Sequence, residues 1–309
     1  MRIYPGTTVD YEFATLGGLG YTGTLNDRQF AALRAEGLTG SLADMFKQFD
    51  GTLGGGGPTL SEQVEAMLSG TDGYVIPLRS AAQLKQDPAG TIAVAAASDP
   101  IGRINTLYGN TAHNFQTTTD PFRAAWSGVA AAIADGTDDW MQGSTAAITV
   151  FQNKPNFYVC GRAQWNALAG ASFGIGFGNN PLCRFDVGAS GQVAVQARRA
   201  VASTGTTTVT SANGLISIGI PFTYEVEIDF ASTGGITVSL NGTSVATGTL
   251  ADAPANSDSA NLTRNYIFRS NNNTAAYANM RFGDHVFTQR AMSVGERTIC
   301  RAYVEEIGL

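Results

Sequence analysis

Residues 224–250 hold the feature that most limits how this chain can fold. They read YEVEIDFASTGGITVSLNGTSVATGTL, and apolar side chains alternate with polar ones over 224–230 and again over 236–240. This period of two predicts strands with one buried face. The pair Asn241-Gly242 then predicts a type I′ hairpin turn, because both residues tolerate positive φ. Three consecutive antiparallel strands, each with a face to bury, require a second sheet, so the segment predicts a β-sandwich. The side chains expected to face its core are Tyr224, Val226, Ile228 and Phe230.

Composition narrows the classes of protein to which the chain can belong. Only 14% of its 309 residues are charged, glycine occurs 37 times, and the net charge is −6. Few charges and many turn residues favour a β-rich protein, and an acidic balance argues against nucleic acid as a partner. We find no apolar run of membrane-spanning length, and the start, MRIYPGTTVDYEF, lacks the apolar core of a signal peptide. We therefore expect neither a membrane partner nor a secretory route.

The cysteines indicate a reducing environment. Cys160, Cys183 and Cys300 are widely spaced and odd in number. A disulfide framework needs an even set of cysteines in an oxidising compartment. We therefore predict three buried free thiols in a protein that folds in the cytosol.

The first 73 residues divide into two regions. Residues 1–52 contain two copies of G-x-T-G-[ST]-L-x-D, beginning at Gly20 and Gly37, and each copy leads into a short helix. Such short helices are marginal alone, so they must pack either on the sandwich or on a partner. Residues 53–73 begin with the linker LGGGGP and continue with a helix that a capping box opens at Thr59. No Lys-Ser/Thr follows the glycine run, so we expect no phosphate cradle and no cofactor.

Residues 74–309 are predicted to form the sandwich itself. Short β-rich segments separated by turns exclude βαβ units. Ser293-Val-Gly-Glu296 forms a capping box for a C-terminal helix. The predicted fold is thus mainly β: a two-sheet antiparallel jelly-roll sandwich with a small helical N-terminal region and a C-terminal helix. The segments expected to be strands, besides those in 224–250, are 91–97, 128–135, 146–153, 156–163, 172–178, 192–199, 206–212 and 215–220.

Three motifs within 84–309 belong together. Residues 84–116 carry a QD-x-AGT…V…DP-x-G pattern followed by GN-x-x-H-x-x-Q. Residues 134–141 read ADGTDDWM, and the chain ends TQRAMSVGERTICRAYVEEIGL. Together these motifs resemble concanavalin A-like (laminin G-like) domains in structural proteins of tailed bacteriophages, although Ala134 stands where an aromatic residue is usual. The matching residues of the first motif are Gln86, Asp87, Ala89, Gly90, Thr91, Asp99, Pro100, Gly102, Gly109, Asn110, His113 and Gln116.

The resemblance implies a non-enzymatic virion structural protein, made in the bacterial host cytoplasm. On this interpretation residues 1–50 bind other virion proteins, the sandwich is displayed as a decoration, collar, tail or fibre component, and the chain forms homo-oligomers. The alternative is an adhesin that binds polysaccharide on the bacterial surface. A glycosidase of the same fold is the third interpretation, since the fold by itself implies no single function.

Several acidic and histidine residues are candidates for catalytic or metal sites. Alternate carboxylates on one strand, Glu225, Glu227 and Asp229, resemble the E-x-D-x-E row of some glycosidases, but the order of residue types differs. The simpler interpretation is a solvated outer face. Asp135, Asp138 and Asp139 are conceivable calcium ligands or simply a turn, and neither His113 nor His285 has a partner at metal-ligand spacing. We therefore predict neither a catalytic residue nor a metal site.

Sugar binding is the more open possibility. Sugar sites combine an aromatic ring with amide or carboxylate groups, commonly on loops. Asparagine-rich loops occur around residues 178–180, 255–261 and 270–273. The residues predicted to bind carbohydrate are Asn179, Asn180, Asn271, Asn272 and Tyr277.

Overall fold

The structure is a computed structural model that describes one compact unit of the chain, Leu60–Leu309, together with Pro58 and Thr59. Within this unit the described residues leave gaps at 72, 110–112, 118–122, 169, 178–179, 200–204, 232–234, 252, 254, 258–262 and 270–276. The predicted attachment region, residues 1–52, therefore lies outside the described residues, as do Asn179, Asn271 and Asn272.

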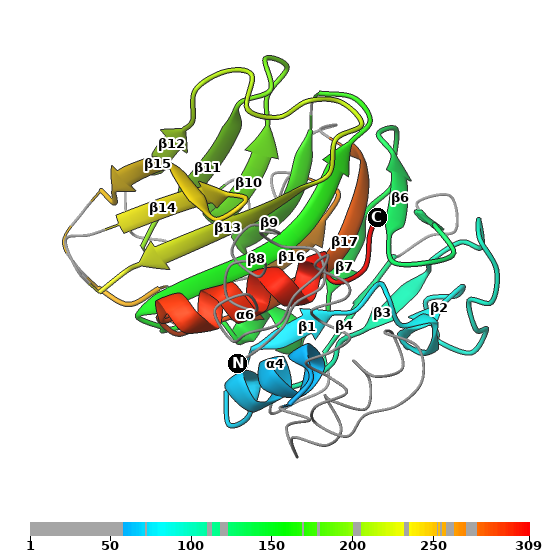
Figure 1. Cartoon of the computed structure of the whole chain (residues 1–309). Helices are drawn as coiled ribbons and strands as arrows, with labels where there is room; N and C mark the ends of the chain where they lie inside the picture. The colour runs from blue at the N-terminus through cyan, green and yellow to red at the C-terminus, as the bar shows by residue number, and fades with distance from the viewer. Residues whose placement is uncertain are drawn as a thin grey trace, which may run out of the picture. The chain divides into compact units, whose positions relative to one another are not determined.

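Two antiparallel sheets make up the unit, as the alternation in 224–250 predicts (Figure 1). The first, sheet A, has the strand order β15-β14-β13-β8-β17-β6-β5, and β1 also pairs with β17. The predicted hairpin is confirmed, since Asn241 and Gly242 connect β14 to β15 with φ of 48° and 79°. The strands of sheet A are β1 (Tyr74–Ile76), β5 (Ala125–Trp126), β6 (Ala132–Asp135), β8 (Asn156–Trp165), β13 (Phe222–Asp229), β14 (Gly235–Leu240), β15 (Thr243–Thr249) and β17 (Asn279–Thr288).

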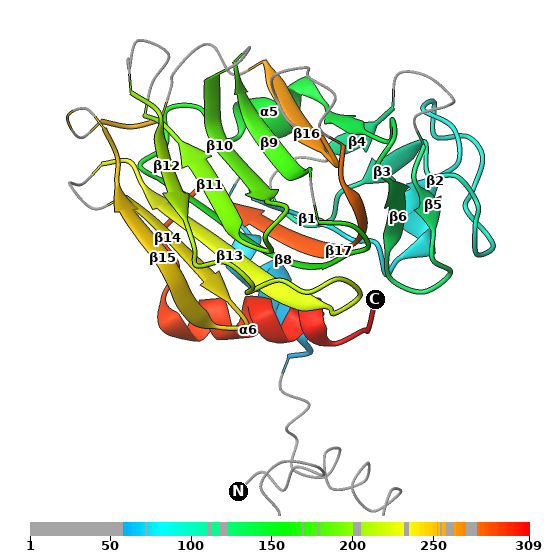
Figure 2. The same cartoon turned by 90° about the horizontal axis from the view of Figure 1, so that it is seen from above.

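The second sheet, sheet B, lies against the first (Figure 2). Its strand order is β12-β11-β10-β9-β16-β7-β4-β3-β2. Its strands are β2 (Leu84–Lys85), β3 (Arg103–Asn105), β4 (Asn114–Gln116), β7 (Met141–Gly143), β9 (Ala171–Phe177), β10 (Asn180–Val187), β11 (Val193–Ala197), β12 (Thr207–Thr210) and β16 (Arg264–Ile267).

The inner faces of the two sheets form one hydrophobic core. The four residues of β13 and its end that were expected to face inward, Tyr224, Val226, Ile228 and Phe230, are all fully buried, which confirms that prediction. Aromatic rings connect the sheets, because Tyr224 of sheet A stacks on Phe185 of sheet B with 4.1 Å between ring centroids.

A chain of hydrogen bonds crosses this core. His285 donates from Nδ1 to the Gly283 carbonyl at 2.7 Å, so its Nε2 accepts from the Tyr224 hydroxyl at 2.6 Å. That hydroxyl also lies 2.9 Å from Ser172 Oγ on sheet B. Burial lowers the pKa of His285 to about 3, so the imidazole is neutral and serves the packing of the sheets.

Two helices pack together on the outer face of sheet A. These are α4 (Leu60–Leu68) and α6 (Val294–Glu305), and their buried side chains form a second apolar cluster with Tyr158 and Cys160 of β8. Figure 2 shows α6 on the side of sheet A that faces away from sheet B. The predicted capping box of α6 is present, since Ser293 and Glu296 exchange side chain-to-backbone hydrogen bonds.

Arg79 fixes the end of α6 to the sheet. Its guanidinium pairs with Asp284 of β17 and with Glu306, and it lies 4.1 Å from the centre of the Tyr303 ring. The side chain of Asp284 is only 2% exposed. A buried carboxylate of this kind is tolerated because the arginine neutralises it.

Three of the segments predicted as strands are not strands. In 146–153 the chain forms the helix α5 (Thr145–Thr149), because Ser144 Oγ accepts a hydrogen bond from Ala147 N and caps it. Residues 91–97 are irregular apart from an isolated β-bridge between Ala93 and Lys85, and Asp99 accepts from the backbone N–H groups of Ala95 and Ala96. Residues 215–220 form turns. Short apolar runs do not distinguish strand from helix or loop, and polar side chains next to the first two segments bind their backbone in non-strand conformations.

The three cysteines are buried free thiols, as the sequence predicts. Cys160, Cys183 and Cys300 are buried and unpaired. Burial raises the pKa of the Cys300 thiol to about 12 and that of the other two thiols as well, so all three stay protonated. None of the described helices is long and apolar enough to cross a membrane. The short 3₁₀ turn η1 (Ala81–Gln83) completes the described elements.

Candidate functional site

The strand register of sheet B places one row of cross-strand partners on its outer face. Each member of the row is the cross-strand partner of the next, from β12 at one edge to β2 at the other. Apolar neighbours along the same strands, such as Phe185 and Phe115, are buried in the core. The outer row contains no aliphatic residue. Its members, in order, are Thr208, Gln196, Arg184, Gly174, Tyr266, Gln142, Gln116, Arg103 and Lys85.

A cavity lies along this row where β4, β7 and the start of α5 meet. Its volume is about 400 Å³, and we call it the amide pocket. The side-chain amides of Asn114, Gln116 and Gln142 line it and make no hydrogen bond to any described residue. Each amide offers two donors and an acceptor. The remaining lining residues are Gly143, Ser144 and Thr145, of which Ser144 is occupied in capping α5.

Aromatic and cationic side chains support the sheet next to the pocket. Tyr266, the cross-strand partner of Gln142, meets the Trp140 ring edge-on, with 5.3 Å between centroids. The Arg269 guanidinium lies 4.9 Å from the Trp140 centroid and 5.4 Å from that of Tyr266. Trp140 and Tyr266 are only 8% and 7% exposed. In this arrangement they brace the sheet, and little ring surface remains for a ligand to stack on.

Of the residues predicted to bind sugar, Tyr277 is the one whose side chain can be related to this region. Its backbone forms an isolated β-bridge with Arg269. The guanidinium of Arg269 lies 5.7 Å from the centre of the Tyr277 ring. Asn180 begins β10, and the other three asparagines lie outside the described residues. The sequence reasoning missed Asn114 and Gln142, because an amide on a two- or three-residue strand gives no local signal.

Arg184 and Asp186 form an ion pair farther along the same face. Arg184 Nε donates to Asp186 Oδ2 at 2.7 Å, whereas Asp186 Oδ1 is buried and has no hydrogen-bond partner in the described part of the chain. Burial raises the pKa of Asp186 to about 6, although Arg184 opposes this shift. The carboxyl group therefore gains a proton in mildly acidic solution.

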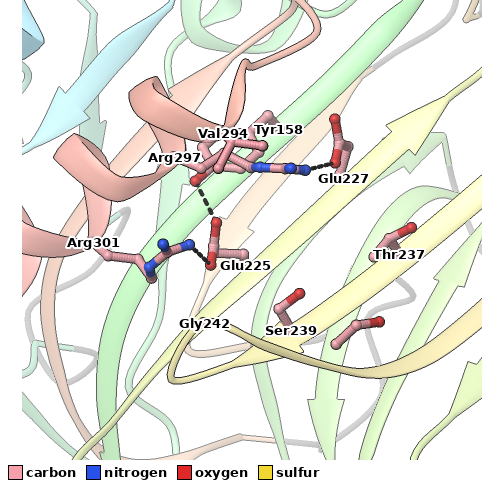
Figure 3. A pocket seen from close by; sticks show the side chains of 10 residues that line it. Tyr158, Glu225, Glu227, Thr237, Ser239, Gly242, Val294, Arg297 and Arg301 are labelled. Carbon is pink, nitrogen blue, oxygen red and sulfur yellow. Dashed lines mark hydrogen bonds and ion pairs between the residues drawn. The ribbon is translucent and has the colours of Figure 1, made fainter.

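The outer face of sheet A carries a second cavity, which we call the helix pocket (Figure 3). Its volume is about 250 Å³, and it lies where α6 borders the outer face of β13, β14 and β15. Arg301 of α6 donates to Glu225 at 2.8 Å, and Arg297 donates to Glu227 at 2.5 Å. The lining residues are Tyr158, Glu225, Glu227, Thr237, Ser239, Gly242, Ser244, Val294, Arg297 and Arg301.

This arrangement corrects the interpretation of the carboxylate row as a solvated face. Glu225 is only 5% exposed, because α6 covers it, and it also accepts from the Tyr158 hydroxyl at 2.9 Å. Burial raises the pKa of Tyr158, so the phenol remains protonated and is a donor rather than a nucleophile. Asp229, the third member of the row, accepts from the backbone of Ala231 in the following turn.

The aspartates considered for calcium do come together. Potential ligand atoms of Asp135, Asp138 and Asp139 lie within 4.8 Å of one another. Asp139 accepts from the Asp135 backbone N–H at 2.8 Å, and Asp135 accepts from Thr137 N at 2.7 Å. Burial raises the pKa of Asp139 to about 6. Two of the carboxylates thus already hold the turn together.

No protein-family model matches the sequence, and no curated protein matches it. Among solved structures, Trypanosoma rangeli sialidase in complex with 2,3-difluorosialic acid matches with a TM-score of 0.51 and 12% identity, over 86% of this chain and 40% of that one. This likeness supports the two-sheet β-sandwich and, at such identity, shows the fold alone.

Two further structures match with lower TM-scores. NanB sialidase from Streptococcus pneumoniae matches with a TM-score of 0.47 and 14% identity, over 55% of this chain and 27% of that one. The CBM40 domain of Ruminococcus gnavus IT-sialidase, bound to α2,3 sialyllactose, matches with a TM-score of 0.42 and 12% identity, over 52% of this chain and 87% of that one. The chain thus spans about a quarter of the length of the NanB structure.

These comparisons contradict one sequence-based prediction. We predicted that the chain is not an enzyme, but a sialidase is among the solved structures that share its two-sheet fold. The chain is similar to parts of enzymes, and its fold therefore gives no ground for calling it non-enzymatic.

Proposed function

We propose that the chain binds carbohydrate on the outer face of sheet B, at the amide pocket. The observation that carries this proposal is the set of three side-chain amides, Asn114, Gln116 and Gln142, that line one cavity and make no hydrogen bond to any described residue. An amide donates and accepts at neighbouring atoms, which matches the paired hydroxyl groups of a sugar ring. An apolar ligand would leave the amides without partners, at a cost of about 1–3 kcal/mol for each buried group.

The row that crosses the pocket favours an extended ligand over a single sugar. Nine strands at a spacing of about 4.8 Å give the row a length of about 38 Å. Along it, amide, guanidinium, hydroxyl and ammonium groups succeed one another from Thr208 to Lys85. A polysaccharide lying across the strands meets a polar side chain at most steps, except at Gly174 and Tyr266, which are buried. The amide pocket is the best-formed position on this path.

The sandwich shared with a sialidase supports the proposal at the level of the fold. The resemblance of 84–309 to phage structural proteins supports a bacterial surface polysaccharide as the source of the ligand. That resemblance also supports a second proposal: the chain is displayed on a virion, where residues 1–50 attach it to other virion proteins. A chain that lacks residues 1–50 is then expected to fold but to stay out of particles, and normal incorporation would contradict the attachment role.

A glycan array with the full chain tests carbohydrate binding. We expect selected polysaccharides to bind, and the double variant Gln116→Leu, Gln142→Leu to bind them at least tenfold more weakly. Gln164→Leu is the matched control, because Gln164 lies on sheet A outside both pockets. Equal binding by the double variant and the parent would contradict the proposal.

The same samples distinguish binding from hydrolysis. Each bound polysaccharide is incubated with the chain, and mass spectrometry then detects any released fragment. Release that persists in the double variant would locate the chemistry away from the amide pocket. Release that the double variant abolishes would make the pocket part of an active site.

A further inference from the structure

The helix pocket contains more polar groups than the docking of α6 requires. Arg301 and Arg297 of the helix are each paired with a carboxylate of β13, and Tyr158 completes the partners of Glu225 (Figure 3). These contacts hold the helix against the sheet. The remaining polar side chains of the pocket belong to β14 and β15, and α6 does not use them.

Three hydroxyl groups make up this remainder. Thr237, Ser239 and Ser244 line the pocket, and none of their hydroxyls bonds to a described residue. The strand register places Ser239 directly opposite Glu225 and Thr237 directly opposite Glu227, and Ser244 follows Ser239 on the next strand. Side chains directly opposite on neighbouring strands have Cβ atoms about 4.5–5.5 Å apart. The pocket floor is therefore a compact patch of alternating carboxylates and hydroxyls.

The charges of the pocket balance. Two glutamates face two arginines, so the lining carries no net formal charge. One oxygen of Glu227 is bound to Arg297, and its other oxygen accepts from no described residue. Free acceptor and donor positions thus lie side by side without an excess of either charge. An anion would compete with Glu225 and Glu227 for the arginines, and a cation would compete with the arginines for the carboxylates.

We infer that the helix pocket is a second binding site, specific for a neutral polyhydroxylated ligand the size of one sugar unit. Neighbouring ligand hydroxyls donate to Glu227 and accept from Arg297, while Thr237 and Ser239 bond to the far side of the ring. A volume of about 250 Å³ is below the range of about 300–1,000 Å³ typical of drug-sized ligands, so it suits a single ring. The site lies on the opposite face of the sandwich from the amide pocket and is independent of it.

Ligand-observed NMR with the full chain tests this inference. The probes are D-glucose, D-galactose and N-acetyl-D-glucosamine as neutral sugars, with D-glucuronate as the charged comparison. We expect at least one neutral sugar to bind the parent chain, and the variant Thr237→Val, Ser239→Ala to bind it at least tenfold more weakly. Thr247→Val is the matched control, because Thr247 is the cross-strand partner of Thr237 but does not line the pocket.

The two double variants distinguish the two proposed sites, because each variant should weaken binding at one site only. Binding of the single sugar should persist in Gln116→Leu, Gln142→Leu, whatever becomes of the polysaccharide. Thermal unfolding checks that Thr237→Val, Ser239→Ala folds like the parent. Three results would each overturn the inference: no neutral sugar bound, equal binding by the hydroxyl variant, or a preference for D-glucuronate. None of them bears on the amide pocket.

Discussion

The two outer faces of the sandwich differ in what covers them. On sheet A, helix α6 lies over β13, so that Glu225 and Glu227 are paired with arginines of the helix. On sheet B, the amides of Gln116 and Gln142 line a cavity and have no partner among the described residues. Both faces are polar by the same strand alternation. The carboxylates of β13 are thus paired within the chain, whereas the amides of the sheet B pocket remain available.

The same alternation of apolar and polar residues thus produces two kinds of outer surface, one covered by a helix and one open to a ligand. A polar group that is covered must find a partner within the chain, because an unpaired buried group costs about 1–3 kcal/mol. Sheet A meets this requirement with ion pairs and a capping box. Sheet B leaves its amides at an open pocket, where water or a ligand satisfies them. Loss of an ion-paired side chain that α6 covers on sheet A should therefore cost more stability than loss of an amide at the pocket of sheet B.

The largest expected effect is on the covered face. Replacing Asp284 by Ala leaves Arg79, whose side chain is only 12% exposed, without its main partner and should lower the free energy of unfolding by about 3–5 kcal/mol. Urea denaturation measures this change. Glu306→Ala is the control, because Glu306 is exposed and pairs with the same arginine, so about 1 kcal/mol or less is expected. Equal losses in the two variants would contradict the assigned role of burial.

The second effect is a pH dependence of the free energy of unfolding that comes from Asp186 on the outer face of sheet B. The pKa of Asp186 is raised to about 6 in the folded chain, so folding favours its protonated form. Its stabilising contribution is complete below the unfolded pKa of about 3.9 and is lost as the pH rises through about 6, by up to about 3 kcal/mol. Urea denaturation from pH 4 to pH 7 measures this. Asp186→Asn should flatten the pH profile, and an unchanged slope would rule out the raised pKa.

The third effect is a pH dependence of stability with the opposite sign, and it comes from Glu296 at the start of α6. Arg290 and the capping box hold the pKa of Glu296 down at about 2. Its contribution is present above the unfolded pKa of about 4.3 and is lost as the pH falls toward 2. Glu296→Gln should cost about 1 kcal/mol at pH 7, the usual size of a cap contribution, and less at pH 3. A loss that does not shrink on acidification would be evidence against this assignment.

The smallest expected effect is on the open face. Gln116→Leu and Gln142→Leu should each change the free energy of unfolding by no more than about 0.5 kcal/mol, because their amides have no partner within the described chain to lose. Chemical denaturation alongside the binding assay measures both properties in one preparation. A loss above about 2 kcal/mol would mean that the amides hold the sheet together and would remove the contrast between the two faces.

Local sequence determined the elements that a short pattern can specify. Period-two alternation identified β13 and β14, Asn241-Gly242 identified the turn from β14 to β15, and Ser293 with Glu296 identified the start of α6. It also determined which side chains of β13 are in the core. Each of these depends on residues only two to four positions apart, where backbone sterics and capping act directly.

Tertiary structure alone decided what the outward side chains meet. The alternation places Glu225 outside the core, but only the packing of α6, some seventy residues later in the chain, buries it against Arg301. Likewise Asn114 and Gln142 come together because β4 and β7 pair in sheet B. The alternation of a strand fixes which face a residue takes. The partner on that face comes from long-range pairing, and no window of neighbouring residues contains it.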